Sequence, residues 1–417
     1  MYHTGMLSVV LSDIAETSMK SNPNIKTTVS IGGKKFRYYT GATAEGLTFY
    51  FFDIPNKGTS TTKPTLTKMQ IRVNFSKLLR AGEHVVLPTA ADDLYKILRK
   101  KYFEVIPDVL PCKALYRPDF DCISVSRLDY CYNITGLSQE LIDSYIRILS
   151  KGNLEKFPAV RRALSPSGKV KQYTVDENNN EVKMRDGSLY CGNQSITINI
   201  YDKRKMMLKF NEDHKKEYPN GYYSSAAIDA ATGVLRCEIQ CNGKKLYNLC
   251  KSNGLQKSIK ECLDPHLSKS VLLDYVSRIS YKETHYNSRK WESLIAKANH
   301  TQIVKEQLLE ILELVSIKGM KIFKVREKTK TAALQKRATF NSRIRTLRKD
   351  GINPIPIPIN KGSELESLYS RLQREYDAGL LRLVPDVSTP EPTEPDYTQF
   401  MDMWDDVPIS TMLDELL

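Results

Sequence analysis

The residues best suited to chemistry lie in the segment 195–201, where isoleucines alternate with polar residues. Side chains of a strand point alternately to its two faces, so the isoleucines should be buried while Asn199 and Tyr201 share the other face. A tyrosine hydroxyl, with a pKa near 10, becomes a nucleophile only when neighbouring groups help to remove its proton. Three cationic residues suited to phosphate follow at once: Lys203, Arg204 and Lys205. The segment predicts a tyrosine that cleaves a phosphodiester, although tyrosine is also an ordinary strand residue.

Two further segments, 122–134 and 234–241, have the same strand alternation. If all three strands share a sheet, the polar face that carries Tyr201 also carries Arg127 with Asp129 and Arg236 with Glu238. Two carboxylates are hard oxygen donors suited to Mg²⁺ or Mn²⁺, and such an ion can polarise a phosphoryl oxygen. The competing interpretation is cross-strand ion pairing on a solvent-exposed face, where each pair contributes at most about 1 kcal/mol.

The sequence contains no histidine motif that is typical of a metal site. The six histidines include no pair separated by one hydrophobic residue. We therefore expect a carboxylate-based metal site at Asp129 and Glu238. Lys203 and Arg236 are expected to assist the tyrosine, and the phosphate backbone is expected to contact Arg127, Asn199, Arg204 and Lys205.

The charge distribution points to a polyanionic partner. The chain of 417 residues has a net charge of +14, but no lysine or arginine follows Arg382. Because nine acidic residues lie in that tail, residues 1–382 carry a net charge of +23. A body this basic favours nucleic acid as the partner. No apolar run approaches the ~20 residues of a membrane span, and scattered cysteines indicate a reducing compartment, so we expect a cytoplasmic protein without membrane contact.

The elements that position these residues predict an α+β fold with two RRM-like antiparallel lobes. Residues 1–110 read as the first lobe, with strands at 6–11, 27–31, 35–39, 47–52 and 68–75 and a helix at 91–102. Residues 111–262 read as the catalytic lobe, where a helix at 139–149 begins after Ser138 and an exposed hairpin covers 169–184.

The remainder of the chain is expected to be helical and then disordered. Residues 263–351 read as a basic helical domain whose duplex contacts would come from Lys336, Arg337, Arg343 and Arg345. Residues 352–382 read as a linker, which begins with INPIPIPI, and one helix at 364–375. Residues 383–417 read as a disordered acidic tail that could recruit a helicase or a single-strand-binding protein, or occupy the basic groove as a DNA mimic.

Four segments taken in order carry a resemblance to known replication proteins: MQIRVNFSKLLRAGEHVV, SVSRLDYCYNI, SITINIYDKRK and VLRCEIQC. They resemble the filamentous-phage gene II/X replication initiators, and the last three are also similar to rolling-circle initiators of Gram-positive plasmids. The resemblance covers roughly residues 65–250. It implies that Tyr201 nicks an origin and joins to DNA as a 5′-phosphotyrosine, leaving a free 3′-OH primer. It also implies that Asp129 and Glu238 lie at the metal site. We expect the protein to act in a bacterial host cell.

Three alternatives stay open at the level of sequence. Tyr218, Tyr222 and Tyr223 lie in a polar stretch and are rival nucleophiles. The protein could instead be a non-catalytic origin-binding or regulatory protein on the same scaffold. An RNA-binding protein is disfavoured because the predicted polar face has one aromatic residue and is otherwise charged.

Overall fold

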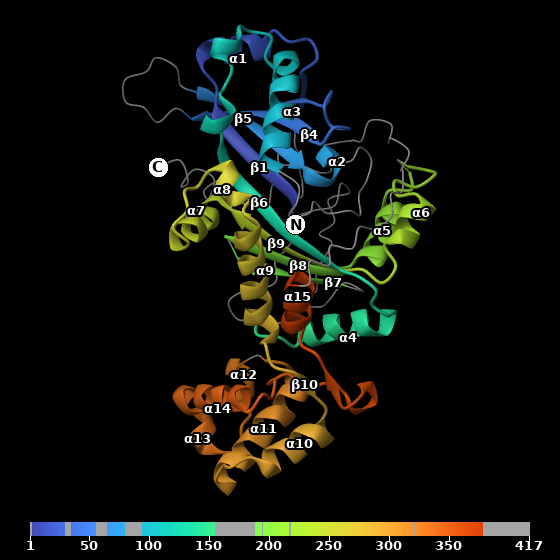
Figure 1. Ribbon diagram of the computed structural model, residues 1–417, viewed down its shortest axis with the longest axis vertical. Helices are drawn as coiled ribbons and strands as arrows, with labels where there is room; N and C mark the ends of the chain where they lie inside the picture. Colours follow the sequence, from blue (N-terminus) through green and yellow to red (C-terminus); the bar gives the residue numbers. More distant parts are fainter. Residues whose placement is uncertain are drawn as a thin grey trace.

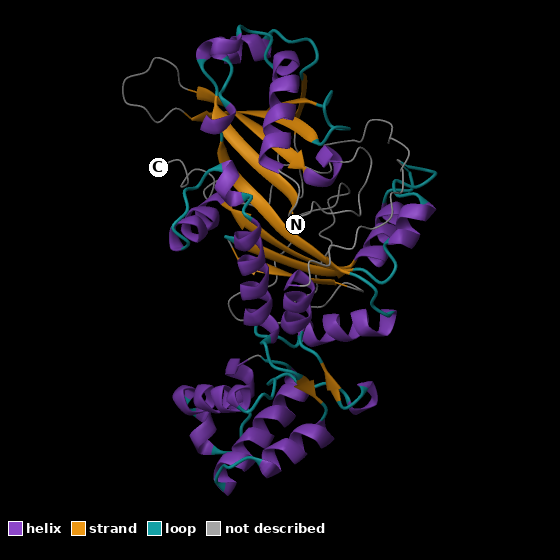
Figure 2. Cartoon of the chain, in the orientation of Figure 1, coloured by secondary structure: helices purple, strands orange, loops and turns teal. Residues whose placement is uncertain are grey.

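A single antiparallel sheet of nine strands forms the centre of the computed structural model, in the order β2-β3-β4-β5-β1-β6-β9-β8-β7 (Figures 1 and 2). The structure describes residues 2–29, 35–55, 65–79, 94–154, 188–193, 195–216, 218–320 and 322–377. The strands are β1 (Tyr2–Val10), β2 (Lys26–Val29), β3 (Lys35–Tyr39), β4 (Leu47–Pro55), β5 (Thr65–Asn74), β6 (Ser124–Ile134), β7 (Ser188–Asn193), β8 (Ile196–Asp202) and β9 (Leu235–Asn242).

The α+β class and the alternating strands are confirmed, but the two expected lobes are halves of one sheet. β1 pairs with β5 on one side and with β6 on the other, which joins the halves without a gap. Their expected RRM-like character is not confirmed. The sequence could not show this joint, because strand alternation reveals which face a residue occupies but not which strand lies beside it.

Helices cover the apolar face of the catalytic half of the sheet. The strongest packing against β6 and β9 comes from α7 (Gly243–Ser252), α8 (Ile259–Cys262) and α9 (Pro265–Ser280). α15 (Leu368–Asp377) returns from far along the chain to lie beside α9 (Figure 1). α4 (Gln139–Ser150) packs at the β7–β8 edge, and its predicted N-cap is confirmed because Ser138 accepts a hydrogen bond from the Leu141 N–H. The opposite, polar face is left for the candidate site.

The other half of the sheet carries α1 (Asp13–Lys20), α2 (Phe75–Leu79) and α3 (Leu94–Val109). Two helices that we did not predict, α5 (Lys203–Asp213) and α6 (Ser225–Ala230), connect β8 to β9. They project from the end of β8 as a separate pair at the side of the molecule (Figure 1). α5 begins two residues after Tyr201.

A helical unit lies beyond the sheet, at the lower end of Figure 1. It contains α10 (Ser288–Lys297), α11 (Gln302–Lys318), α12 (Ile322–Glu327), α13 (Ala332–Gln335), α14 (Arg337–Lys349) and the strand pair β10 (His285–Tyr286) with β11 (Glu364–Leu365). Its hydrophobic core begins near Tyr281, whereas α9 packs with the sheet. The expected boundary at residue 263 thus precedes a helix that belongs to the sheet's core.

The INPIPIPI segment is extended as expected, but it is not a free linker. Ile352, Ile355 and Ile357 are buried in the core of the helical unit. Asn353, also buried, donates hydrogen bonds of 2.8 Å to the carbonyl oxygens of both Ser280 and Glu283. The prolines prevent helix formation, and the isoleucines between them supply apolar surface. The segment therefore packs against the helical unit near the residues that follow α9.

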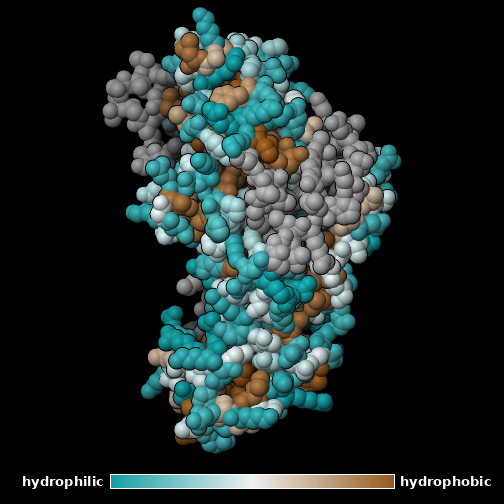
Figure 3. Space-filling model, in the orientation of Figure 1, coloured by the Kyte–Doolittle hydropathy of each residue, from teal (hydrophilic) through white to brown (hydrophobic). Residues whose placement is uncertain are grey.

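Among the residues that the structure describes, no helix is both long and apolar enough to cross a bilayer. Figure 3 shows one face that is largely hydrophilic, with apolar side chains in small separate groups. The predicted hairpin at 169–184 and the predicted acidic tail at 383–417 lie outside the described residues.

The buried His285 predicts a pH dependence of the helical unit's stability. Its Nδ1 donates to the Ile355 carbonyl at 2.7 Å, and burial lowers the pKa of the ring to about 4 although that bond opposes the shift. The unfolded chain takes up this proton near pH 6.5 while the folded chain does not, so stability present above pH 6.5 is lost as the pH falls toward 4, by about 3 kcal/mol. Trp291 lies in this core, and denaturant unfolding followed by its fluorescence in a Trp404→Phe background measures the loss.

His285→Asn is the matched variant, because an asparagine amide can replace the Nδ1 donor but does not titrate. Its unfolding free energy should change less between pH 7 and pH 4 than that of the parent. Equal pH dependence in the two proteins would contradict this account.

Candidate active site

The register of three neighbouring strands arranges the polar face of the catalytic half in rows. Asn133 on β6 lies opposite Arg236 on β9, which in turn lies opposite Tyr201 on β8. In the next row Glu238 lies between Cys131 and Asn199, and in the third Gln240 lies between Asp129 and Thr197. The predicted face thus assembles as expected from alternation, with Arg127, Asp129, Asn199, Tyr201, Arg236 and Glu238 on one side of the sheet.

A β-bulge in β1 adds two residues that alternation alone would not place together. Tyr2 pairs with Tyr130 and Gly5 pairs with Leu128, so His3 and Thr4 both lie opposite the single residue Asp129. A bulge of this kind redirects side chains, and bulges are frequent beside active sites. The Thr4 hydroxyl donates to the Asp129 carboxylate, and His3 reaches toward Glu238.

Asp129 is fully buried and held by two neighbours. The Arg127 guanidinium binds it through two hydrogen bonds, from Nε at 2.7 Å and from an Nη at 2.8 Å, in addition to the Thr4 hydroxyl. A carboxylate offers about four lone-pair positions, so these donors leave room for one further partner. Arg127, expected to contact DNA, here orients Asp129.

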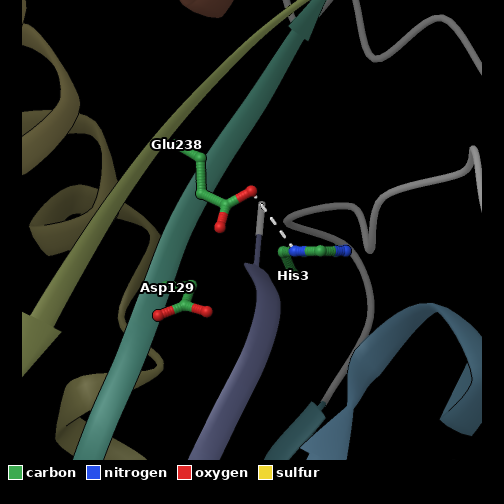
Figure 4. A group of neighbouring side chains, drawn as sticks. All are labelled: His3, Asp129 and Glu238. Atoms are coloured by element: carbon green, nitrogen blue, oxygen red, sulfur yellow. Dashed lines mark ion pairs between the residues drawn. The ribbon is translucent and has the colours of Figure 1, made fainter. Parts of the chain in front are cut away.

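His3, Asp129 and Glu238 form a group that could hold a metal ion, which we name the metal-ligand cluster, and one donor atom from each residue lies within 4.8 Å of the others (Figure 4). The Nδ1 of His3 lies 3.3 Å from a Glu238 carboxylate oxygen. That nitrogen is buried without a well-directed hydrogen bond, although the whole side chain is 27% exposed. A buried nitrogen that faces the Glu238 carboxylate, with Asp129 also within 4.8 Å, fits a shared cation.

The charge states of these side chains also suit a cation. Burial lowers the pKa of His3, against the opposing effect of Glu238, which favours the neutral imidazole that ligates metals. Burial would raise the pKa of Glu238, but the charge of a protonated His3, a hydrogen bond from Gln240 and the charge of Arg236 lower it. The last two persist when His3 is neutral, so Glu238 is a carboxylate.

The cluster contains both carboxylates that we predicted and adds a histidine that we did not predict. The search for paired histidines missed His3 because the residue lies far away in the sequence, and because β1 begins at Tyr2 rather than at the predicted residue 6. His3 could have been found by extending the predicted first strand toward the N-terminus, through the glycine and threonine at positions 5 and 4.

Tyr201 is almost completely buried beside Arg236. The Arg236 side chain is fully buried, donates from Nε to Asn133 at 2.8 Å and hydrogen-bonds Tyr201. Burial raises the pKa of the Tyr201 hydroxyl well above its ordinary value, and the charge of Arg236 partly offsets that rise. In this state the phenol is protonated, so nucleophilic attack needs additional positive charge or a base.

Lys203 turns inward rather than toward open solvent. It is 2% exposed, and burial followed by the charge of Arg236 lowers its pKa well below the ordinary value, which favours the neutral amine. Asp202 is the N-cap of α5: it accepts hydrogen bonds from the Lys205 N–H at 3.0 Å and from Gln139 at 2.9 Å. This cap fixes the turn by which the chain leaves Tyr201 and enters α5.

The other predicted DNA contacts are spread over two places. Arg204 and Lys205 are half-buried on the first turn of α5, and the Lys205 Nζ lies 3.0 Å from an Asp143 oxygen. On the helical unit, Lys336, Arg337 and Arg345 are exposed. Arg343 instead donates to Gln307 at 2.7 Å.

The rival tyrosines pack against one another rather than extending into solvent. Tyr218 is buried, and Tyr222 and Tyr223 are half-buried in a group of aromatic rings. None of the three belongs to the strand face that carries the metal-ligand cluster.

No protein-family model and no curated protein sequence matches this chain. Among solved structures, the chain is similar to a rolling circle replication initiator protein from Geobacillus stearothermophilus, with a TM-score of 0.31 and 10% identity over 68% of this chain and 86% of that one. Because a likeness this distant carries no functional weight, we base the function on the geometry of the site.

The cluster predicts binding of Mn²⁺ by the protein alone. Relative to Tyr201→Phe protein, the added substitution His3→Ala should weaken Mn²⁺ binding at least tenfold, since even partners that only orient ligands contribute about 10-fold to 100-fold. Titration calorimetry or the Mn²⁺ electron paramagnetic resonance signal measures this. His266→Ala, which removes an exposed histidine elsewhere, is the matched control. Equal affinities in the two histidine variants would rule out His3 as a ligand.

Proposed function

We propose that this protein is a rolling-circle replication initiator that nicks one DNA strand with Tyr201. The observation that carries the proposal is the row Asn133, Arg236 and Tyr201, which lies on the same sheet face as the cluster of His3, Asp129 and Glu238. A tyrosine fixed beside a guanidinium and next to a cation site is suited to attack on a phosphodiester.

The charges of the site support an anionic substrate. With neutral His3 and Lys203, the carboxylates of Asp129 and Glu238 balance the guanidiniums of Arg127 and Arg236, and the buried Asp202 beside Tyr201 adds one negative charge. A divalent cation, a phosphodiester and a tyrosine phenolate whose proton has passed to Lys203 add three positive and two negative charges. Because buried charge must be compensated, the site favours cation and phosphate jointly over either one alone.

The proposed reaction exchanges one phosphoester bond for another. The Tyr201 oxygen attacks phosphorus, the bond from phosphorus to the 3′ oxygen breaks, and a 5′-phosphotyrosine forms. The phenolic proton passes to the Lys203 amine, and the resulting ammonium returns a proton to the departing 3′ oxygen, which becomes the 3′-OH that primes synthesis. The bond energy stays in the ester, so the reverse exchange rejoins the strand after a round of replication.

Arg236 has a positioning and electrostatic role in this scheme. It hydrogen-bonds the nucleophile, and its charge stabilises both the phenolate and the developing charge on the phosphate. A divalent ion held by His3, Asp129 and Glu238 would polarise a phosphoryl oxygen and supply positive charge near the phenol. Since imidazole joins the donor set, we expect Mn²⁺ to fit better than Mg²⁺.

The helical unit is proposed to hold duplex DNA near the origin. Lys336, Arg337 and Arg345 project from α13–α14, while Phe340, Ile344 and Leu347 of α14 face the core. Asn199, Arg204 and Lys205 would contact the strand near Tyr201. Recruitment of a helicase or a single-strand-binding protein through the acidic segment 383–417, and action in a bacterial cytoplasm, are part of the same proposal.

Covalent capture of DNA tests the nuclease. A library of single-stranded oligonucleotides with randomised centres and 3′ labels is incubated with Mn²⁺, and denaturing gels reveal labelled protein. The parent should form an adduct and release a fragment that ends in a 3′-OH. Tyr201→Phe should abolish the adduct, whereas Tyr247→Phe, which alters an exposed tyrosine on α7, should retain it.

Absence of any adduct from the parent, with DNA binding intact, would contradict nicking and favour a non-catalytic origin-binding protein. The buried, protonated state of the phenol without cation is the observation behind that alternative. An adduct of equal yield in Tyr201→Phe would move the nucleophile to another tyrosine.

A salt titration tests the helical unit. The exposed Arg345 should neutralise one phosphate, so Arg345→Gln should reduce the slope of log affinity for duplex DNA against log salt concentration by about one. Arg278→Gln is the control, because Arg278 on α9 is paired with Asp274. Fluorescence anisotropy at several salt concentrations gives the slopes, and equal slopes for parent and Arg345→Gln would exclude the contact.

A further inference from the structure

A group of five aromatic rings, which we name the aromatic platform, lies between α5 and the loop that precedes α6. Its members are Phe210, His214, Tyr218, Tyr222 and Tyr223. Phe210 is the centre: its ring centroid lies 4.1 Å from that of His214 in a stacked arrangement, 5.1 Å from that of Tyr222 and 5.5 Å from that of Tyr223. Tyr218 joins through an edge contact with Tyr222 at 5.2 Å.

The loop that carries these tyrosines is fixed to α5. The Asn211 side chain accepts a hydrogen bond from the Tyr223 N–H at 2.8 Å and donates to the Tyr223 carbonyl at 2.7 Å. Gly221 has φ +84, and a Cβ there would lie 2.7 Å from the Asn211 amide nitrogen. Glycine is therefore required beside Asn211, and the ring positions are set before any ligand arrives.

The platform continues directly into the candidate active site. Tyr223 is half-buried as a residue, yet its hydroxyl is close enough to Arg236 for that charge to act on its pKa, which burial raises to about 12. The Lys203 Nζ lies 5.6 Å from the centroid of the Tyr223 ring. The Tyr223 end of the platform thus lies next to Arg236 and Lys203, and the other end extends away along α5.

The surroundings are suited to a polyanion. Lys215 and Lys216 follow α5 and are exposed, and Arg204 and Lys205 lie on its first turn. The helix pair has its own aliphatic core of Met207, Ala227, Ile228 and Ala231. Tyr223 packs against this core and Tyr218 is buried, whereas Phe210, His214 and Tyr222 are half-buried, so part of the ring surface reaches solvent beside these cations.

We propose that the aromatic platform stacks unpaired bases of single-stranded DNA next to the phosphate that Tyr201 attacks. Base–aromatic stacking tolerates any base and contributes in proportion to the rings engaged. Unstacked bases beside the scissile bond would place the backbone along α5, with its phosphates toward the lysines and the reacting phosphate toward Arg236. This inference rests on the proposed function for the phosphate's position, but stacking itself needs no chemistry.

Tyr222 provides the test, since it contacts three other rings without reaching the metal-ligand cluster. In the Tyr201→Phe protein with EDTA, binding of a single-stranded oligonucleotide that contains 2-aminopurine is followed by anisotropy and by 2-aminopurine fluorescence. Tyr222→Leu should weaken binding roughly 5-fold to 100-fold and reduce the quenching, while Tyr222→Phe should retain both. The salt slope should stay unchanged, because no charge is removed.

Phe103→Leu is the matched control, an exposed aromatic residue on α3 in the other half of the sheet, and it should bind like the parent. Circular dichroism melting verifies that each variant is folded. Equal affinity and quenching in Tyr222→Leu and Tyr222→Phe would overturn the platform. Because the measurement uses no metal and no nucleophile, its outcome is independent of the adduct assay: stacking without adducts would refute only the nuclease, and adducts without stacking only the platform.

Discussion

Compensation of buried charge is the constraint on which the rest of this structure depends. Asp129, Arg236 and Glu238 are nearly inaccessible to water, and an unpaired ion in such a place would be strongly destabilising. The antiparallel register of β6, β9 and β8 supplies the partners, since it sets Asn133 and Tyr201 on either side of Arg236. A shift of one residue in any of these strands would send its charged groups into the apolar core. Burial of the isoleucine and cysteine side chains fixes the strand register. The same register brings the polar residues of the site together.

The end of β8 concentrates several roles in a few residues. Tyr201 is the penultimate residue of β8, Asp202 ends the strand and caps the following helix, and Lys203 is buried near Arg236. α5 then carries the chain outward along the aromatic platform. Because these residues are consecutive, the distance from nucleophile to helix is fixed by covalent geometry as well as by packing. The positive end of the α5 dipole lies next to the tyrosine, where a phosphate would also be favoured.

Much of the shared face could be predicted from the sequence, because strand alternation is local. It placed Asp129, Tyr201, Arg236 and Glu238 on one side of a sheet, and the pairing of the strands agrees. His3 was beyond reach, since its position depends on a bulge and on the pairing of β1 with β6, both of which are properties of the whole sheet. Lys203 was expected to assist the tyrosine, but its burial could not be predicted, because it depends on α5, a helix that we did not predict. The prolines of INPIPIPI predicted its extended conformation. Its burial could not be predicted, because it depends on helices elsewhere in the chain.

Mass-spectrometric mapping of the covalent DNA adduct tests the central claim most directly. After nuclease trimming and tryptic digestion, Tyr201 lies in the peptide of residues 186–203, whereas Tyr218, Tyr222 and Tyr223 all lie in the peptide of residues 217–236. The account predicts a nucleotide on the first peptide, with fragmentation assigning it to Tyr201 rather than Tyr190. A nucleotide on the second peptide, or on Tyr190, would contradict it.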